Sequence, residues 1–142
     1  YIIIPKEDIR TKYNNQTDRE FLNGPSVFGY QALISAYEQG DNWVDAQNEH
    51  LKKNYQYLKE YLKNELPELV VTKLEGTYLV WLDLSFTHLS TEELLEKCNK
   101  AGITCSGGVA FCKDYESYLR FNIACPFNQL EEGLKRLVKA FK

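Results

Sequence analysis

The sequence predicts an α+β fold in which helices cover one face of a small sheet. From Leu69 onward, strand and helix patterns follow one another in the order strand, strand, helix, strand, strand, helix. A long helix with one apolar stripe is predicted over residues 42–65, ahead of these elements. Strands and helices grouped in this way are typical of a sheet whose helices lie together on one side.

The N-terminal residues show a different pattern. Tyr1–Ile4 is a short apolar run rich in β-branched side chains, and it predicts a buried strand that ends at Pro5. Residues 6–13 are charged and predict a helical stretch, whereas the polar residues 14–24 predict a loop. This part of the chain therefore looks like a piece of a larger body.

A helix is predicted to begin at Pro25-Ser26 and to end at Gly40-Asp41, because glycine commonly follows the last turn of a helix. We place a domain boundary there, with residues 1–41 as one part and residues 42–142 as a smaller C-terminal domain. The sequence contains no methionine, even at its first position, so we expect the chain to be a fragment.

The predicted long helix carries its apolar residues on one stripe, with Lys, Glu and Asn on the opposite side. The stripe consists of Val44, Leu51, Tyr55, Leu58 and Leu62. His50 lies among polar neighbours on this helix, so we expect its ring to be solvated.

Short strands are predicted after the long helix, at Val70–Thr72 and Thr77–Leu84, with a hairpin turn at Glu75-Gly76. A third strand is predicted at Ile103–Cys105, and the glycine-rich segment Ser106–Phe111 predicts a loop.

Two further helices complete the predicted domain. Ser90 and Glu93 form the S-x-x-E pattern of a capping box, which predicts a helix that extends to Lys100. Asn128–Glu131 repeats the capping pattern and predicts the start of the last helix. The apolar face of that helix consists of Leu130, Leu134, Leu137, Val138 and Phe141.

The strand predicted before Pro126 begins at Tyr118, and the other elements are expected to pack around it. Strand side chains alternate, so this strand has one core face. That face consists of Leu119, Phe121 and Ile123. Arg120 lies on the opposite face, and its planar guanidinium suits a carboxylate held by two hydrogen bonds. The alternatives for Arg120 are an ion pair with Asp83 and a solvated edge strand.

Three segments resemble known enzymes. Arg120-Phe121-Asn122-Ile123-Ala124-Cys125-Pro126 is similar to the Arg-apolar-Asn-apolar-Ala strand near the C-terminus of pyridoxal-phosphate (PLP) enzymes with the aspartate aminotransferase fold. Glu75-Gly76-Thr77-Tyr78-Leu79-Val80-Trp81-Leu82-Asp83 resembles the branch of that family that contains cystathionine β-lyases and related C–S lyases. Residues 26–54 resemble the same branch. The resemblance covers nearly all of this chain, but only the C-terminal part of the family's length.

The resemblance implies the small C-terminal domain of a fold-type-I PLP enzyme, with a mostly antiparallel sheet. It implies that residues 1–41 are a remnant of the large PLP-binding domain with its interdomain helix, and that Arg120 binds the α-carboxylate of a small amino-acid substrate. The implied parent protein is a PLP-dependent lyase that cleaves cystathionine or cysteine. An aminotransferase of the same fold is the first alternative, and a non-catalytic α+β binding or interaction module is the alternative from another class.

The resemblance also indicates what the chain lacks. The family's cofactor-binding lysine stands in a Ser/Thr-x-x-Lys context, and no lysine here has that setting. We therefore expect no catalytic or cofactor-binding residue in this chain, and an inactive fragment that does not hold PLP tightly. Where the family has Pro-Gly and then an aromatic residue with Gly, this sequence has Gly107-Gly108 and Phe111-Cys112. The loop is either a wall of the substrate pocket or a plain connection.

Bulk properties exclude several classes of function. A net charge of −3 argues against binding to nucleic acid or to an anionic membrane surface, and no apolar run has the length of a spanning helix. The four cysteines (Cys98, Cys105, Cys112 and Cys125) lack the paired spacing of a zinc site and predict free thiols in a cytoplasmic protein. We expect no metal, and the resemblance implies a homodimeric parent protein.

Overall fold

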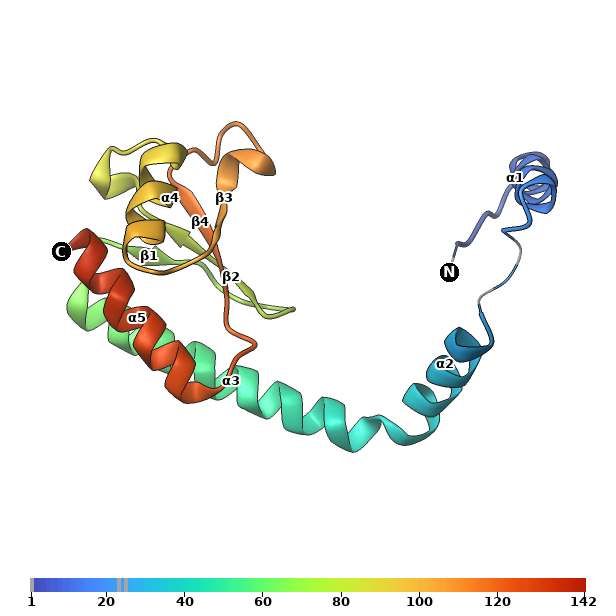
Figure 1. Cartoon of the computed structure of the whole chain (residues 1–142), viewed down its shortest axis with the longest axis horizontal. Coiled ribbons are helices and arrows are strands. Elements are labelled where there is room, and N and C mark those ends of the chain that lie inside the picture. The colour runs from blue at the N-terminus through green and yellow to red at the C-terminus, as the bar shows by residue number, and fades with distance from the viewer. Residues whose placement is uncertain (1, 23, 25) are drawn as a thin grey trace. The chain divides into compact units, whose positions relative to one another are not determined.

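The computed structural model describes residues 2–22, 24 and 26–142. Figure 1 shows the helices and strands along the chain. The described residues divide into two compact units, with the boundary between Val44 and Asp45. No helix in this part of the chain is long and apolar enough to cross a membrane.

The described residues of the first unit contain helices α1 (Glu7–Arg19) and α2 (Val27–Gln39). Helix α2 starts and ends as predicted, although Pro25 itself lies outside the described residues. The hydroxyl of Ser26 accepts a hydrogen bond from the backbone N–H of Gly29 (3.1 Å), and Gly40 follows the last turn. Neither helix has a buried residue. The exposed apolar residues of α2 are Val27, Phe28, Tyr30, Leu33, Ile34 and Tyr37.

The strand predicted at residues 1–4 is wrong for the residues that the structure describes, which are residues 2–4. They form no strand, and the side chains of Ile2 and Ile3 are 64% and 77% exposed. A strand needs a neighbouring strand to satisfy its backbone N–H and C=O groups, and none of the described strands pairs with this run. Its apolar composition alone does not produce a strand. Tyr1 lies outside the described residues.

The loop predicted at residues 14–24 is also wrong over its first part, because α1 continues to Arg19. The hydroxyl of Thr17 donates to the backbone carbonyls of Tyr13 (3.2 Å) and Asn14 (3.0 Å). Polar side chains that bond back to the preceding turn in this way are compatible with a continuous helix.

In the second unit, the described residues form an antiparallel sheet with the strand order β1-β2-β4-β3. The strands are β1 (Val70–Val71), β2 (Leu79–Asp83), β3 (Ser106–Gly107) and β4 (Tyr118–Asn122). The connection between β1 and β2 is the predicted hairpin. Strands β2 and β4 form the longest pairing and therefore the centre of the sheet.

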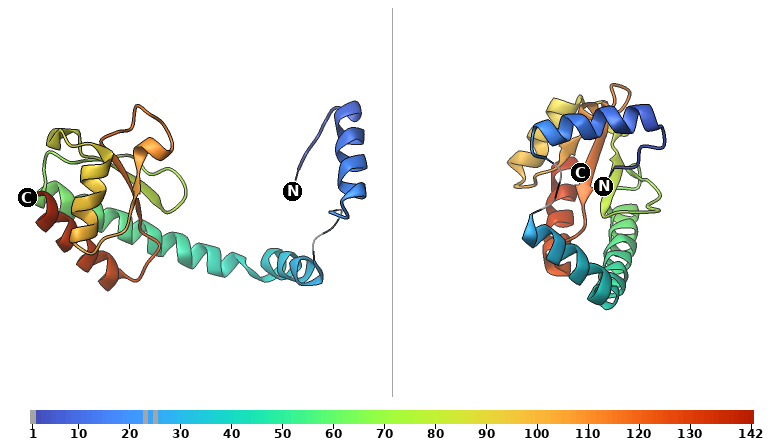
Figure 2. Two further views of the ribbon diagram at one scale, coloured as in Figure 1. Left: turned by 45° about the horizontal axis from the view of Figure 1, so that its top comes forward. Right: turned by 90° about the vertical axis from the view of Figure 1, so that its right-hand side faces the viewer.

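Helices α3 (Asp41–Glu65), α4 (Thr91–Lys100) and α5 (Phe127–Phe141) supply the rest of the core. Figures 1 and 2 show α3 and α5 side by side. Two short 3-10 helices, η1 (Ser85–Thr87) and η2 (Gly108–Ala110), lie in the connections. The buried core includes Leu58 and Leu62 of α3, Val80 and Leu82 of β2, Leu94 of α4, Leu119 and Phe121 of β4, and Leu130, Leu134, Leu137 and Val138 of α5. The predicted α+β fold is confirmed.

Helix α4 begins with the predicted capping box. The backbone N–H of Ser90 donates to Oε2 of Glu93 (2.9 Å), while the hydroxyl of Ser90 accepts from the backbone N–H of Glu93 (3.4 Å). The hydrogen bond from the backbone of Ser90, followed by that from its hydroxyl, lowers the pKa of the Glu93 carboxyl.

The strand predicted at Ile103–Cys105 is wrong, and Ser106–Gly107 pairs with β4 in its place. The helix end explains the difference. Gly102 adopts a positive φ of 75°, and the backbone N–H of Ile103 bonds to the carbonyl of Cys98 (2.9 Å). Ile103 is thereby used to close α4, because its N–H satisfies a carbonyl of the last helical turn.

The last helix begins earlier than predicted. Its N-cap is Pro126, and the side chain of Asn128 accepts from the next backbone N–H, that of Gln129, in place of capping the helix. Strand β4 correspondingly ends at Asn122, before the predicted stop at Pro126. Proline suits a helix start because its missing N–H would have no partner within the helix.

Candidate functional site

Arg120 lies in the middle of β4, which is flanked by β2 and β3. The interpretation as a solvated edge strand is therefore wrong. In the register of the sheet, Arg120 is opposite Trp81 on one side and Ser106 on the other. These three residues face away from the helices, because their neighbours Leu82 and Leu119 face the core.

The guanidinium of half-buried Arg120 has two recorded partners among the described residues. Its Nη2 donates a hydrogen bond to the hydroxyl of Ser106 (3.2 Å). Its Cζ lies 4.5 Å from the ring centroid of Phe111, a distance at which a cation and a ring face attract each other. No ion pair joins Arg120 to a described carboxylate. Its charge is therefore available for an anionic ligand.

The alternative of an ion pair between Arg120 and Asp83 is also wrong, because Asp83 has other partners. Ser85 donates to Oδ1 of Asp83 through its backbone N–H (2.9 Å) and its hydroxyl (2.5 Å). Partial burial alone would raise the pKa of the Asp83 carboxyl, but the hydrogen bonds from Ser85 and Tyr118 outweigh it and lower the pKa. The hydrogen bond between Tyr118 and Asp83 raises the pKa of the Tyr118 hydroxyl.

Aromatic rings surround the guanidinium. Trp81 and Phe111 meet edge to face, with centroids 5.3 Å apart and an interplanar angle of 90°. Tyr115 lies 5.8 Å from Trp81 and 5.1 Å from Tyr118, again between ring centroids. Rings at such distances attract one another beyond the simple burial of their area. The cluster places an apolar wall beside the charge of Arg120.

Close packing requires glycine at the last residue of β3, Gly107, and at the first residue of η2, Gly108. A Cβ at Gly107 would overlap the methyl group of Thr91, and a Cβ at Gly108 would overlap the backbone carbonyl of Tyr115. Both residues are buried, so their backbone lies against protein atoms and does not form an open cradle for a phosphate.

Sequence reasoning identified Arg120 and the loop after β3, but it did not connect Ser106 or the rings to Arg120. The signal was present in part, since an aromatic residue at Phe111 belongs to the pattern of the resemblance. The approach of Ser106 depends on the pairing of β3 with β4, which begins three residues later than the predicted strand.

The structure corrects the prediction for His50. Its ring is half-buried, and Nε2 lies 2.9 Å from the carbonyl oxygen of Cys125. On the same face of α3, the buried amide of Asn54 donates to the carbonyls of Ile123 (2.9 Å) and Cys125 (3.0 Å). Two polar side chains of α3 therefore hold the backbone that follows β4.

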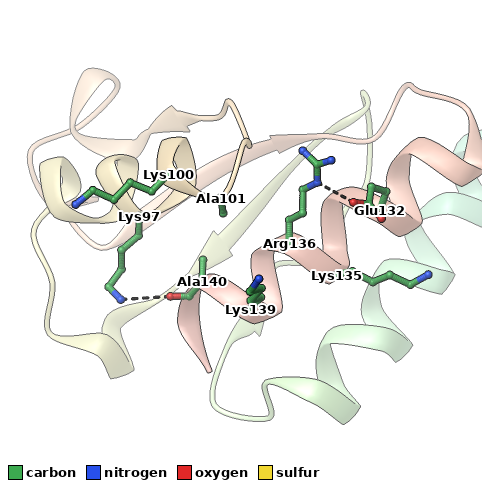
Figure 3. Close-up of a pocket in the computed structure, with 8 residues that line it drawn as sticks. All are labelled: Lys97, Lys100, Ala101, Glu132, Lys135, Arg136, Lys139 and Ala140. Carbon is green, nitrogen blue, oxygen red and sulfur yellow. Dashed lines mark hydrogen bonds and ion pairs between the residues drawn. The ribbon is translucent and has the colours of Figure 1, made fainter.

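A groove of about 580 Å³ lies between α4 and α5 and is lined mainly by basic side chains (Figure 3). The cations that line it are Lys97, Lys100, Lys135, Arg136 and Lys139. Three of them pair with a glutamate one turn away on the same helix, at N–O distances of 2.7–3.3 Å. Such pairs and the helix dipoles account for basic residues at helix C-termini, so this groove needs no ligand to explain it.

All four cysteines are free thiols, as predicted. Within the described residues, no group of three or more His, Cys, Asp or Glu side chains is placed to hold a metal ion.

Comparison with known proteins extends the resemblance. Residues 2–137 match the family described as aminotransferase class I and II. The chain is 32% identical over 140 residues to cystathionine beta-lyase PatB of Bacillus subtilis (strain 168), across 98% of this chain and 36% of that protein. It is 31% identical to Protein MalY of Escherichia coli (strain K12), across 100% of this chain and 37% of that protein. The chain thus spans little more than a third of the length of these relatives.

Solved structures agree with the sequence comparison. A PLP-bound putative aminotransferase from Clostridium difficile 630 superposes with a TM-score of 0.92 at 31% identity, across 99% of this chain and 36% of that one. Cystalysin from Treponema denticola, whose structure contains a pyridoxal 5'-phosphate cofactor, gives a TM-score of 0.87 at 30% identity. The match covers 97% of this chain and 35% of that one. The chain belongs to the aminotransferase class I and II family.

Proposed function

We propose that this chain is the part of a PLP-dependent C–S lyase that binds the α-carboxylate of an amino-acid substrate. The main support for this proposal is the position of the Arg120 guanidinium. It lies on the face of the sheet away from the core and is paired with no described carboxylate. The names of the relatives, among them several cystathionine beta-lyases, support cystathionine as the substrate. The products of such a cleavage are a thiol, pyruvate and ammonia.

Arg120 acts in this proposal by binding and orientation. Two parallel hydrogen bonds from a guanidinium fix both the position and the plane of a carboxylate. The carboxylate is bonded to Cα of the substrate, so fixing it also fixes the direction of the Cα bond that is to be broken. The rings of Trp81 and Phe111 strengthen the interaction, because they exclude water from one side of the charge pair.

The cofactor proposed for the whole protein is pyridoxal phosphate, which two of the solved neighbours carry. The described residues around Arg120 do not fit it, so the proposal assigns the cofactor and the catalytic lysine to residues outside this chain. In this proposal residues 1–41 belong to the large domain and residues 42–142 form the small domain. On the family resemblance we further propose a cytoplasmic homodimer.

An aminotransferase of the same fold is the second candidate. The specific observation in its favour is the TM-score of 0.92 with a structure named as a putative aminotransferase. Carboxylate binding by Arg120 would serve both reactions, so the products decide between them. The whole protein incubated with cystathionine should release pyruvate and ammonia if it is a lyase, and should convert an added keto acid to an amino acid if it is an aminotransferase. The family match argues against an unrelated binding module.

The role of Arg120 is tested by R120A and R120K in the whole protein. Loss of a charge-assisted pair costs about 1.5–3 kcal/mol, so we expect R120A to raise KM roughly ten- to a hundredfold. R120K should recover only part of this loss, because an ammonium keeps the charge but not the planar fork. The melting temperature should change little, since Arg120 has one neutral hydrogen bond and one ring contact. A normal KM with a clearly lower melting temperature would make Arg120 a structural residue.

A further inference from the structure

The side chain of Arg120 has several rotatable bonds, so its guanidinium samples many orientations unless neighbouring groups hold it. Ser106 is the residue opposite Arg120 in the pairing of β3 with β4. This register brings the serine hydroxyl to 3.2 Å from Nη2 of Arg120. One edge of the guanidinium is therefore held by a side chain on a neighbouring strand.

Phe111 contacts the same guanidinium. Its ring centroid lies 4.5 Å from Cζ of Arg120, and the ring meets Trp81 edge to face at 5.3 Å. Trp81 is the residue opposite Arg120 in the pairing of β2 with β4. Arg120 is thus held from both sides, by Ser106 on β3 directly and by Trp81 on β2 through Phe111.

We infer that Ser106 and Phe111 are positioning residues that set the edge and the plane of the Arg120 guanidinium before a carboxylate ligand arrives. The inference rests on the proposed function of Arg120 and deepens it by naming the side chains that aim it. Ser106 accepts from one N–H group of Nη2, and the ring of Phe111 lies beside the guanidinium carbon. The remaining N–H groups are left for the two oxygens of a carboxylate.

The chemistry of residue 106 matters for this role. A hydroxyl accepts one hydrogen bond and leaves the positive charge of Arg120 uncompensated. A carboxylate at the same position would form an ion pair with Arg120 and compete with the ligand. The variant S106D is therefore expected to impair binding as strongly as removal of Arg120, although it adds a favourable contact to the folded protein.

The experiment measures KM and kcat of the whole protein with cystathionine for S106A and F111L. Each should raise KM about 3- to 10-fold, the value of one neutral hydrogen bond or ring contact, without lowering the melting temperature. S106T and F111Y keep the hydroxyl and the ring and should restore KM. F127L is the matched control, since Phe127 is 47% exposed against 52% for Phe111 and its recorded ring partner is Tyr57.

A double-mutant cycle then connects these residues to Arg120. In the R120A background, S106A and F111L should have no further effect on KM, because the group that they position is absent. If they keep their full effect there, or have no effect when Arg120 is present, the positioning inference is overturned while the proposed function stands. If R120A itself leaves KM unchanged, the proposed function fails first.

Discussion

Asn54 is a polar residue in the middle of an apolar core, and its side chain is fully buried. Its amide nitrogen donates to the carbonyls of Ile123 and Cys125, whereas its Oδ1 has no hydrogen-bond partner within the described residues. An unpaired buried acceptor costs about 1–3 kcal/mol. The residue therefore reduces stability at one atom while it fixes the backbone between β4 and α5.

We expect N54A to destabilise the second unit by about 2–3 kcal/mol, since it removes the side-chain donor from the carbonyl of buried Ile123 and leaves the carbonyl of Cys125 with His50 alone, and since it opens a cavity in the core. Urea unfolding of the chain measures this change. N48A is the control, because Asn48 is exposed on the same helix, and it should change the free energy of unfolding by less than about 0.5 kcal/mol. Equal effects of the two substitutions would contradict the role of the Asn54 hydrogen bonds.

At single residues, sequence reasoning succeeds where the property is local. The core side of β4 follows from alternation alone, and Leu119, Phe121 and Ile123 are buried as predicted. It fails for His50, because the carbonyl that this ring contacts lies 75 positions away. Local polarity says nothing about a partner at that distance.

Among the elements, α4 has the most clearly defined start, and its capping box makes stability depend on pH. Hydrogen bonds from Ser90 lower the pKa of Glu93 in the folded state. A carboxyl with a lowered folded pKa stabilises the protein above its unfolded pKa, which is about 4.3 for glutamate. This contribution is lost as the pH falls from that value through the folded pKa.

E93Q tests this dependence, because glutamine keeps an acceptor oxygen but does not titrate. We expect E93Q to be less stable than the parent chain at pH 7, and the difference should disappear as the pH is lowered below about 4. Denaturant unfolding at a series of pH values provides the measurement. E92Q removes the same charge from the same turn without touching the bond to Ser90, so an identical pH profile for E92Q would show that the cap is not responsible.

Helix ends were predictable where a side chain caps them, as at Ser26 and Ser90. They were not predictable where the backbone closes the helix. The N–H of Ile103 completes α4, and this use of the residue moves the third strand to Ser106. A propensity pattern cannot show which of two elements will use a given backbone group.

At the scale of the whole molecule, the buried hydrophobic residues that the structure describes belong to one of the two units. Among the described residues, these run from Leu58 to Val138 and lie in the second unit. We expect residues 45–142 to unfold cooperatively at nearly the same denaturant midpoint as the whole chain, because the deletion removes no part of this core. Circular dichroism measures the midpoint.

The same deletion should reduce self-association of the isolated chain, since it removes the exposed apolar residues of α2. Light scattering over a range of concentrations tests this, with residues 1–142 as the comparison. A large fall in the unfolding midpoint would show that the first unit contributes to the stability of the core. Association that persists after the deletion would show that the exposed apolar residues of α2 do not cause it.

Amino-acid substitutions on the two faces of β4 have different consequences for the evolution of such a protein. Substitutions at Leu119 and Phe121 affect the packing of the core, whereas under the proposed function a substitution at Arg120 affects the binding of a carboxylate. Because the two kinds of position alternate along the same strand, selection for a new substrate can act on one side of the sheet while the other keeps the domain intact. A lineage with this arrangement can acquire different reactions on an inherited core.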